Sequence, residues 1–557
     1  MAEVEKVSAE VISVYPNKVK IAVDDDFIQS ASETLKIGSY IRISDDDDIA
    51  LIAMIDNFLI EVPEEGTAKR RYIIEANPLG VVKDDKFQRG GDTIAIPPKK
   101  VEPAKESEIL SIYSHSTEEK EKFTFSSLSS NKKIRIPVNG NKFFNKHIAV
   151  IGSTGSGKSH TVTKIIQQAV AQKNGDFSLN NSHIIIFDIH SEYKSAFPNA
   201  NNLGIEDLVL PYWLLTSEEL EELFIDTEAN DHNQRNVFKE SVITDRKNKF
   251  KGAEADKHKI HYDSPLLFDI NEVLSFAKSK NEEIIDTGEV YASGAKKGQP
   301  KTTKGSLNGI LTNFISRLEN KLNDKRFDFL LGERSKKISF EETIKQLTGQ
   351  NSSAKNNVTI IDLSGVPFEV LSITVSLISR IIFEYGYYYK KIRTRKDPNE
   401  KINNDTPFLL VYEEAHKYVP KSDLMKFRAS KNSIERIAKE GRKYGVTLLL
   451  ASQRPSELSE TIFSQCNNFV AMRLTNPIDQ NYVKRLLPDT LGNITDKLPS
   501  LQAGEGLLIG EAVILPSIIK VDECKLPPSS NDIPYWELWK EEWKEADINE
   551  IKTEWNS

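Results

Sequence analysis

Cysteine is nearly absent from this chain of 557 residues, which contains only Cys466 and Cys524. Two thiols cannot build a framework of several disulfides or a four-cysteine zinc site. The sequence also lacks an apolar run of the roughly 20 residues that cross a bilayer, and it begins without the basic and apolar regions of a secretory signal. We therefore expect a cytoplasmic protein without a membrane partner.

An excess of basic residues is lacking as well. The chain has 74 Lys and Arg residues against 82 Asp and Glu residues, which gives a net charge of −8. Residues 1–60 hold 12 acidic and 5 basic side chains, including the runs Asp24–Asp26 and Asp45–Asp48, so the rest of the chain is close to neutral. Because a neutral remainder is compatible with a local basic surface, the overall charge does not decide whether nucleic acid is a partner.

The hydrophobic pattern changes along the chain. Short β-branched runs separated by Gly, Asn and Asp predict a small β-barrel at the N-terminus, and the polar stretch 103–132 is interpreted as a linker or irregular return. From residue 147, apolar strands alternate with long helical segments, which predicts a mostly parallel sheet with helices on both faces, an α/β fold. The expected strands are His147–Ile151, His183–Asp188, Val358–Leu363, Phe408–Tyr412, Val446–Ala451 and Phe469–Arg473. The proposed domains are an N-terminal β-barrel (1–125), the first part of the α/β core (126–215), a helical insertion (216–350), the second part of the core (351–521) and a Trp-rich tail (522–557).

Residues 152–159 match the phosphate-binding pattern G-x-x-x-x-G-K-[ST], between an apolar strand and a helix. Glycines let backbone N–H groups turn toward phosphate oxygens, and the helix N-terminus adds partial positive charge. Lys158 is expected to reach the β- and γ-phosphates of a nucleotide, and Ser159 to bind Mg²⁺. The alternative is a Gly/Ser turn that joins a strand to a helix. The candidate nucleotide-binding residues are Gly152, Ser153, Thr154, Gly155, Ser156, Gly157, Lys158, Ser159 and His160.

Hydrolysis of a bound nucleotide also needs carboxylates. Glu413 and Glu414 follow the strand Phe408–Tyr412, at the edge where open α/β sheets place ligands. Because adjacent strand residues face opposite ways, we assign Glu413 to the Mg²⁺ shell, through a water molecule, and Glu414 to the attacking water. The alternative is an acidic pair that stabilises a helix N-terminus. Gln453, after the next strand, is a candidate to orient the water or sense the γ-phosphate.

Two other patterns are weighed and set aside. Asn320–Asn323 lacks the Asp of the guanine-binding pattern N-K-x-D, which disfavours a GTPase. Asp188, His190 and Glu192 are metal-ligand types, but without a fourth ligand we favour a hydrogen-bonded loop beside the nucleotide over a metal site.

Several segments together resemble the HerA-type hexameric DNA translocases of the HerA–FtsK superfamily, and the resemblance runs from about residue 5 to 521. They are the phosphate loop, Phe187–Tyr193, Glu413–His416, Gly441–Gly445, Ala451–Pro455 and Gly504–Gly510. Ser191 departs from the pattern, because the family more often has Gly there. The N-terminal barrel resembles the HerA–ATP synthase barrel of that family.

The resemblance implies a RecA-like P-loop ATPase domain that uses ATP and Mg²⁺. It also implies a homohexameric ring that hydrolyses ATP at subunit interfaces and pulls duplex DNA through its channel. Such a site needs a positive group from the neighbouring subunit to neutralise the γ-phosphate. Arg442 is the first candidate, with Arg454 and Lys146 next, so the expected catalytic set is Lys158, Glu413, Glu414, Gln453 and Arg442.

Three basic segments qualify as DNA contacts, and for each the alternative is a solvated surface. They are Arg246–Lys251, Lys296–Lys304 and Lys390–Lys396. In the tail, Trp536, Trp539 and Trp543 have the spacing of one helix face. We favour docking of this aromatic face on the same or a neighbouring ATPase domain over an exposed interaction patch.

The leading functional hypothesis is an ATP-driven duplex DNA translocase or helicase. Because the chain has no nuclease constellation, it is expected to act with a separate effector, of nuclease or NAD-hydrolase type by the resemblance, in DNA end processing or antiphage defence. The acidic barrel is the expected platform for that effector. One alternative is an ATP-dependent hexameric scaffold that assembles and regulates an effector, with translocation secondary. Another is an ATPase that acts on protein substrates.

Overall fold

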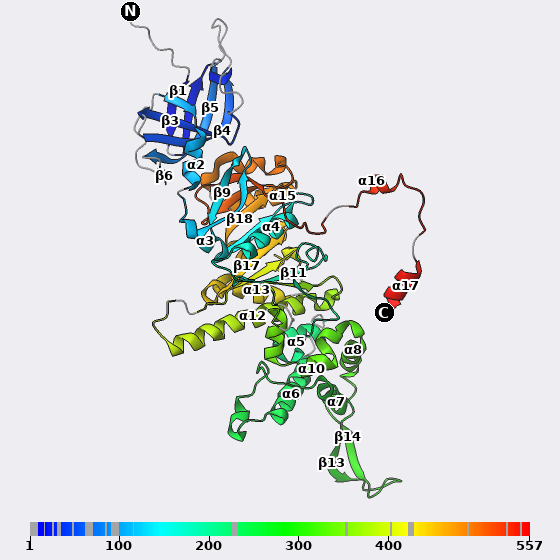
Figure 1. The fold of residues 1–557 in the computed structure, drawn as a ribbon. Helices are drawn as coiled ribbons and strands as arrows, with labels where there is room; N and C mark the ends of the chain where they lie inside the picture. The colour runs from blue at the N-terminus through cyan, green and yellow to red at the C-terminus, as the bar shows by residue number, and fades with distance from the viewer. Residues whose placement is uncertain are drawn as a thin grey trace, which may run out of the picture.

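Three parts follow one another along the long axis of the computed structural model (Figure 1). They are an N-terminal antiparallel sheet, a central mixed sheet with helices, and a helical region that ends in a β-hairpin. The structure describes residues 9–15, 17–24, 27–29, 35–46, 49–61, 71–83, 86–90, 100–114, 116–225, 232–350, 355–401, 404–421, 428–486, 489–530, 533–545 and 548–556. Asp25, Asp26, Asp47 and Asp48, from the acidic runs, lie outside these residues.

The N-terminal sheet is curled and entirely antiparallel in the part described. Its strands are β1 (Ala9–Tyr15), β2 (Lys18–Val23), β3 (Tyr40–Asp46), β4 (Ile49–Glu61), β5 (Arg71–Lys83), β6 (Lys86–Arg89) and β7 (Lys100–Pro103). They pair in the order β1-β2-β5-β4-β3-β7, with β6 on β5. Ile21, Ile41 and Ile74 are fully buried inside the curl. The expected β-barrel is therefore confirmed only as a curled sheet, since its end strands β1 and β7 are not paired with each other in the described residues.

The polar stretch 103–132 is not a linker. It contains helix α2 (Glu106–Ser114) and strand β8 (Lys122–Leu128), and β8 pairs in the central sheet with β9 (Asn131–Asn139). Phe123 and Phe125 are buried and alternate with polar residues. The strand signal was therefore present but was hidden by the Lys, Glu and Ser residues around it.

The central sheet is α/β and mostly parallel, as predicted. Its remaining strands are β10 (His147–Ile151), β11 (His183–Asp188), β12 (Asn201–Leu203), β15 (Val358–Asp362), β16 (Phe408–Tyr412), β17 (Val446–Ser452), β18 (Cys466–Met472), β19 (Glu505–Gly510) and β20 (Ser517–Val521). Their order is β12-β15-β11-β16-β17-β10-β18-β19-β20-β8-β9, parallel from β12 to β18 and antiparallel beyond. All six expected core strands are present, with ends that differ by up to three residues.

Strand β17 lies between β10 and β16, in parallel with both. The phosphate loop follows the carboxyl end of β10, Gln453 follows that of β17, and Glu413 and Glu414 follow that of β16. The strand order therefore brings together three motifs that are far apart in the sequence.

One set of helices packs around this sheet, and a second set makes up most of the segment between β12 and β15. Around the sheet they are α3 (Gly140–Phe144), α4 (Lys158–Ala171), α12 (Phe368–Lys396), α13 (Arg428–Glu440), α14 (Glu460–Phe463) and α15 (Pro477–Leu486). Between β12 and β15 they are α5 (Ser217–Phe224), α6 (His232–Lys249), α7 (Ile270–Asn281), α8 (Thr312–Asn323), α9 (Asp328–Leu331), α10 (Glu333–Lys337) and α11 (Phe340–Leu347), and the hairpin β13 (Ile284–Val290) and β14 (Pro300–Lys304) follows α7. Within the described residues, no helix combines the length and apolarity that a bilayer crossing requires.

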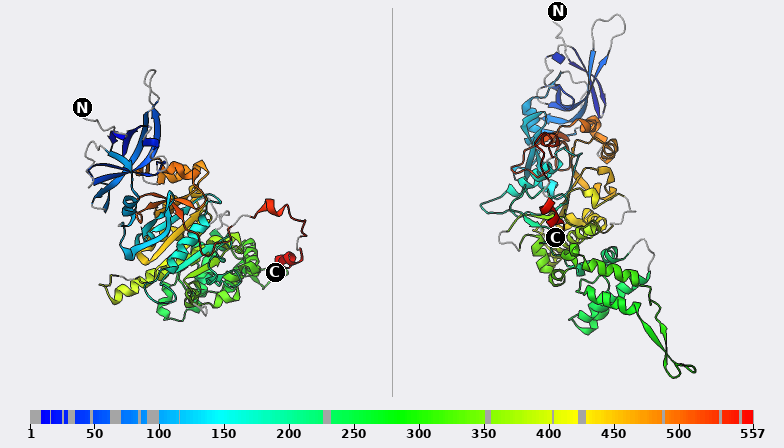
Figure 2. Two further views of the ribbon diagram at one scale, coloured as in Figure 1. Left: turned by 45° about the horizontal axis from the view of Figure 1, so that its top comes forward. Right: turned by 90° about the vertical axis from the view of Figure 1, so that its right-hand side faces the viewer.

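In its described residues, the C-terminal tail contacts the core at its start. Up to Ser529 it runs beside α4 and the loop after β11, where the Ser529 amide donates to the Glu192 carbonyl oxygen at 2.8 Å. Beyond this point Trp536, Trp539 and Trp543 are exposed, and the tail extends away from the body (Figure 2). The expected helix through Trp543 is not formed, since α16 (Tyr535–Leu538) ends after four residues and α17 (Ile548–Asn556) is separate. A short helix without a packing partner is marginal in water, which explains the early end.

His147, the first residue of β10, gives the fold a pH dependence. Its buried ring donates from Nε2 to the Ala438 carbonyl oxygen at 2.9 Å and accepts at Nδ1 from the Leu448 amide at 3.1 Å, so it is held neutral. Burial, with a smaller contribution from Arg442, lowers the pKa of His147 to about 4. Because the unfolded chain binds this proton more readily, stability is present above a pH of about 6.5 and is lost as the pH falls toward 4.

We expect the free energy of unfolding of the core to fall by about 2 kcal/mol between pH 7 and pH 5 through this residue alone. Denaturant titration of the wild type and of His147→Gln at the two pH values measures it. The variant cannot take up the proton. Its free energy of unfolding should therefore fall by about 2 kcal/mol less than that of the wild type between pH 7 and pH 5. Identical pH dependence in both proteins would contradict the assignment.

Candidate nucleotide-binding and hydrolysis site

The phosphate loop has glycine at the positions where its backbone takes positive φ angles. Gly155 and Gly157 have φ angles of 71° and 95°, in the left-handed region that favours glycine. A Cβ atom on Gly157 would also lie 3.1 Å from the Gly504 amide nitrogen, which leaves little space for a side chain. Gly157 is the N-cap of α4, so the loop leads directly into the helix N-terminus. This geometry suits the binding of an anion by backbone N–H groups.

Segments from the neighbouring strands hold the loop in place. The Ser153 amide donates to the Arg473 carbonyl oxygen at 2.8 Å, and the Gly504 amide donates to the Ser156 carbonyl oxygen at 2.8 Å. The Thr475 amide donates to the Ser153 hydroxyl oxygen at 3.1 Å. The loop is therefore held from the side of β18 and β19 before any ligand binds.

A chain of polar contacts links the loop to β16 and β17. Lys158 Nζ lies 3.1 Å from Glu414 Oε1, and both side chains are buried. Gln453 Nε2 donates to the same carboxylate oxygen at 2.6 Å, and the Thr154 hydroxyl donates to Gln453 Oε1 at 2.5 Å. The structure thus brings together Lys158, Glu414, Gln453 and Thr154.

Glu414 is held in an unusual conformation. Its φ of 46° is one of only two positive values at non-glycine positions in the described residues. Such a conformation costs of order 1–3 kcal/mol and persists where the surroundings impose it. Burial raises the pKa of Glu414, but the charges of Lys158 and His416 and the hydrogen bonds from Lys158 and Gln453 together outweigh burial and keep the pKa below its usual value. Glu414 is therefore an ionised carboxylate that is able to accept a proton.

Glu413 has a different environment from its neighbour. Burial and the nearby carboxyl groups of Asp188 and Glu192 raise the pKa of Glu413 to about 10. Its Oε2 atom is buried and has no hydrogen-bond partner. The two consecutive glutamates thus differ in charge state at neutral pH, and only Glu414 has the charge of a base.

The loop after β11 is organised by Asp188. This buried carboxylate accepts hydrogen bonds from the backbone amides of His190, Glu192 and Tyr193 at 3.3, 3.1 and 2.9 Å. His190 is exposed, and among the described residues no group of three or more His, Cys, Asp or Glu is arranged to hold a metal ion. The geometry is that of a hydrogen-bonded loop, the interpretation that the sequence favoured.

Ser191 occupies a position where glycine would fit best. Its φ is 54°, and its hydroxyl donates to Asp362 Oδ2 at 2.6 Å and contacts Ser364 Oγ at 3.0 Å. The side chain thus compensates for a conformation that costs about 1–2 kcal/mol. Ser191 thus takes the left-handed conformation that glycine would favour at this position.

The oxygen donors near Tyr193 fit a hard cation. Burial raises the pKa of Tyr193 well above its usual value, and Glu413, Asp188 and Glu192 raise it further, while the Ser159 hydroxyl acts in the opposite direction. Ser159 and Glu413 therefore both lie close to this tyrosine. Mg²⁺ binds in such sites through one or two protein oxygens, phosphate oxygens and water. Ser159 is thus suited to hold Mg²⁺ once a nucleotide supplies the phosphates, and Glu413 would join it only after losing its proton, which the charge of the cation favours.

Three residues are candidates for the positive group that one subunit supplies to the nucleotide site of its neighbour, and they lie at different edges of the sheet. Arg442 is exposed in a turn that precedes β17, at the opposite edge of the sheet from the phosphate loop of its own chain. Lys146 precedes β10 at that same edge and pairs with Glu511 at 2.9 Å. Arg454 follows β17 beside the loop and pairs with Glu457 at 2.7 Å. Of the three, only Arg442 lies far from its own loop and has no acidic partner among the described residues.

The sequence reasoning missed Arg473. This residue follows β18, the other neighbour of β10, and its Nη2 donates to the Gly155 carbonyl oxygen at 3.4 Å. His160, by contrast, lies in the first turn of α4, and its carbonyl oxygen accepts a hydrogen bond from Cys524 Sγ at 3.3 Å. An Arg at the end of an apolar strand was the available signal, but the pairing of β18 with β10 was not visible in the sequence.

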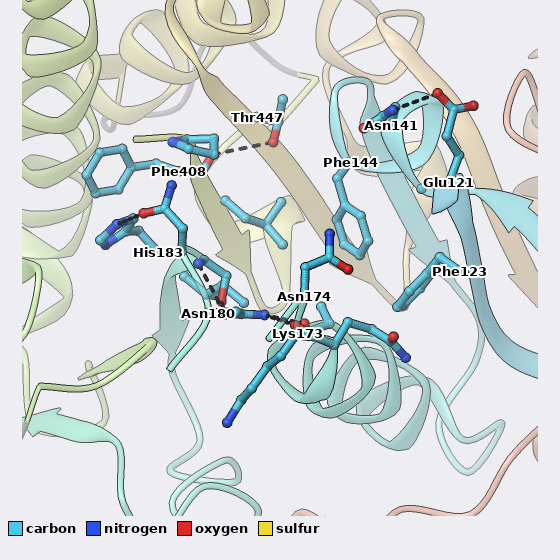
Figure 3. A pocket seen from close by; sticks show the side chains of 18 of the residues that line it. Glu121, Phe123, Asn141, Phe144, Lys173, Asn174, Asn180, His183, Phe408 and Thr447 are labelled. Atoms are coloured by element: carbon cyan, nitrogen blue, oxygen red, sulfur yellow. Dashed lines mark hydrogen bonds between the residues drawn. The ribbon is translucent and has the colours of Figure 1, made fainter. Parts of the chain in front are cut away.

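A separate apolar pocket of about 540 Å³ lies at the opposite edge of the sheet (Figure 3). Phe123, Phe144, His183 and Phe408 line it, with Lys173 at its rim. None of the expected site residues lines this pocket. It is therefore not the nucleotide site.

Comparison with known proteins agrees with this geometry. The family model described as "Helicase HerA, central domain" matches residues 123–382. The DNA double-strand break repair helicase HerA of Sulfurisphaera tokodaii is 29% identical over 433 residues, covering 76% of this chain and 74% of that protein. The protein of the same name from Saccharolobus solfataricus is 26% identical over 514 residues, covering 90% and 86%. Among solved structures, VirB4 of Thermoanaerobacter pseudethanolicus is 14% identical with a TM-score of 0.47, covering 75% of this chain and 98% of that chain. The family model over the middle of the chain, and the two curated relatives over about three quarters or more of it, make this chain similar to the HerA-type ATPases.

Proposed function

We propose that this protein is a homohexameric duplex DNA translocase or helicase driven by ATP hydrolysis. The observation that carries the proposal is the contact of Lys158 and Gln453 with one ionised carboxylate, Glu414, at the mouth of a phosphate loop. The relatives named as DNA repair helicases support DNA as the polymer.

The chain's own residues divide the work in the proposed reaction. The loop amides and Lys158 bind the β- and γ-phosphates, which takes the lysine away from Glu414. Glu414 then accepts a proton from the attacking water, which Gln453 orients. Ser159 and Glu413 would hold Mg²⁺, which when bound neutralises charge on the phosphates.

Translocation is tested by displacement of a third strand from duplex DNA. The wild type should release a labelled triplex-forming strand only when ATP is hydrolysed, because the motor pushes the strand off the duplex. Hydrolysis without displacement on any duplex would reject translocation.

We propose that Arg442 completes the site of the neighbouring subunit. Arg442→Ala and Glu414→Gln should each inactivate a homogeneous ring, but a mixture of the two should recover up to about a quarter of wild-type ATPase activity. Recovery is expected because an Arg442→Ala subunit retains Glu414 and receives Arg442 from a Glu414→Gln neighbour. Phosphate release from mixed and unmixed proteins measures it, with Lys443→Ala as the matched control. A mixture as inactive as its components would exclude a role across the interface.

We also propose that a nuclease or NAD-hydrolase effector binds the N-terminal sheet, in DNA end processing or antiphage defence. The acidic composition of residues 1–60 supports a protein partner there over DNA. Co-purification with the native effector tests it. Substitution of Asp45–Asp48 by Asn should reduce recovery of the bound chain, and unchanged recovery would count against this surface.

A further inference from the structure

The β13–β14 hairpin is an exposed arm. Figures 1 and 2 show it projecting from the helical region, at the end of the molecule away from the N-terminal sheet. All seven residues of β13 are exposed, and so are four of the five residues of β14. An isolated two-stranded hairpin is marginally stable in water, so an arm of this kind is expected to gain a partner in use.

The tip of the arm is preformed. Beyond the paired strands, the Tyr291 amide donates to the Gln299 carbonyl oxygen at 3.1 Å, and the Gly298 amide donates to the Tyr291 carbonyl oxygen at 2.9 Å. Gly294 and Gly298 have φ angles of 86° and 85°, which allow the chain to turn tightly. The side chains at the tip are therefore presented on an ordered turn.

The tip and the second strand of the arm carry charge of one sign. Residues 290–304 contain four lysines and no acidic residue. Lys301 pairs with Glu289 at 3.0 Å. Lys296, Lys297 and Lys304 are exposed and have no ion-pair partner in the part of the chain that the structure describes. Three unpaired cations on a narrow arm favour an anionic partner.

The other two basic segments each use part of their charge within the fold. Arg246 is fully buried, where it donates to the carbonyl oxygens of Leu266 and Trp213 at 3.0 Å each. Lys249 pairs with Asp245 at 2.7 Å. These contacts remove the centre of the first segment from solvent and neutralise part of the remainder.

The third segment ends α12. Arg393 is paired with both Glu400 and Asp405, and Lys390 Nζ donates to the Lys443 carbonyl oxygen at 2.9 Å. Arg395 and Lys396 of this segment are exposed and have no ion-pair partner in the described residues, but they lie in the last turn of a long helix, where cations complement the helix dipole. Lys296, Lys297 and Lys304 of the hairpin have no such helix end to complement.

We infer that the tip of the β13–β14 hairpin binds the phosphate backbone of duplex DNA through Lys296 and Lys297, at the end of the molecule opposite the N-terminal sheet. This inference rests on the proposed DNA translocase and names its point of contact. Contacts to phosphate are independent of base sequence, as a translocase requires. A two-stranded ribbon is also narrow enough to approach a groove of the duplex.

The test compares Lys296→Ser/Lys297→Ser with Lys257→Ser/Lys259→Ser in the full-length protein. The control lysines lie in the same helical region, but they pair with Glu254 and Asp256. Anisotropy of a labelled random-sequence duplex is measured between about 0.05 and 0.2 M salt. The hairpin variant should bind about 20-fold more weakly at about 0.15 M salt, with a salt dependence reduced by about two charges, whereas the control should match the wild type.

Further readouts separate the possible failures. ATPase activity without DNA should be unchanged in the hairpin variant, and light scattering should show the same assembly as the wild type. If the wild type binds DNA and the variant binds it equally with the same salt dependence, the inference is wrong but the proposed function stands. If the variant loses its assembly, the arm binds a second copy of this chain and the inference is also wrong. If the wild type neither binds DNA nor responds to it, the proposed function fails together with the inference.

Discussion

Replacing Glu414 by Gln is expected to lower kcat for ATP hydrolysis by about 100- to 10,000-fold and to leave ATP bound. The amide keeps the shape of the side chain and can still contact Gln453, but it cannot accept a proton from water. Lys158 also loses its buried partner in the nucleotide-free protein, which frees it for phosphate. Phosphate release measures turnover, and binding of a fluorescent ATP analogue measures affinity.

The matched control for this prediction is Glu457→Gln. Glu457 is a partly exposed carboxylate of the same region and pairs with Arg454. Because it does not contact Lys158 or Gln453, its replacement should leave turnover within about twofold of the wild type. Turnover above half of the wild-type value in Glu414→Gln would remove this residue from the reaction and leave the acidic pair as a structural feature.

The second large effect is expected for Lys158→Ala. Loss of the ammonium group removes a cation from the β- and γ-phosphates and should reduce turnover at least about 100-fold, together with ATP affinity. The pKa of Glu414 should rise as well, because the charge of Lys158 is the main factor that lowers it.

Lys164→Ala is the control for the lysine. It lies in the same helix, and its Nζ contacts only a backbone carbonyl oxygen, that of Glu523, at 3.1 Å. Full ATPase activity in Lys158→Ala would contradict the assignment of the phosphate loop. A similar loss in both variants would indicate damage to α4 instead of loss of a phosphate contact.

Much of the core could be predicted because its signals are local. The strand Phe408–Tyr412 is continuously apolar, as a strand buried on both faces must be, and the glycines of the phosphate loop appear where the chain takes positive φ angles. Both features can be recognised from consecutive residues.

What could not be predicted depends on contacts between distant segments. Strand β8 was missed because its partners β9 and β20 decide that Phe123 and Phe125 are buried. Arg473 was missed because only the pairing of β18 with β10 places it beside the phosphate loop.

The charge states of the two glutamates could not be predicted from the sequence either. Glu413 and Glu414 are the same residue type in sequence, yet burial and neighbouring carboxyl groups raise the pKa of the first, whereas a lysine lowers that of the second. That difference in charge agrees with Glu414 as the base, but it adds no support for Glu413 as a Mg²⁺ ligand. Its catalytic meaning stays a prediction.

Coupling of hydrolysis to duplex DNA tests the account most directly. Phosphate release by the wild-type protein is measured with ATP and Mg²⁺, in the presence and in the absence of random-sequence duplex DNA. We predict that the duplex raises the rate and that Glu414→Gln abolishes both the basal and the stimulated rate. A wild type that hydrolyses ATP at one rate whatever duplex is supplied, or that releases no phosphate at all, would contradict the account.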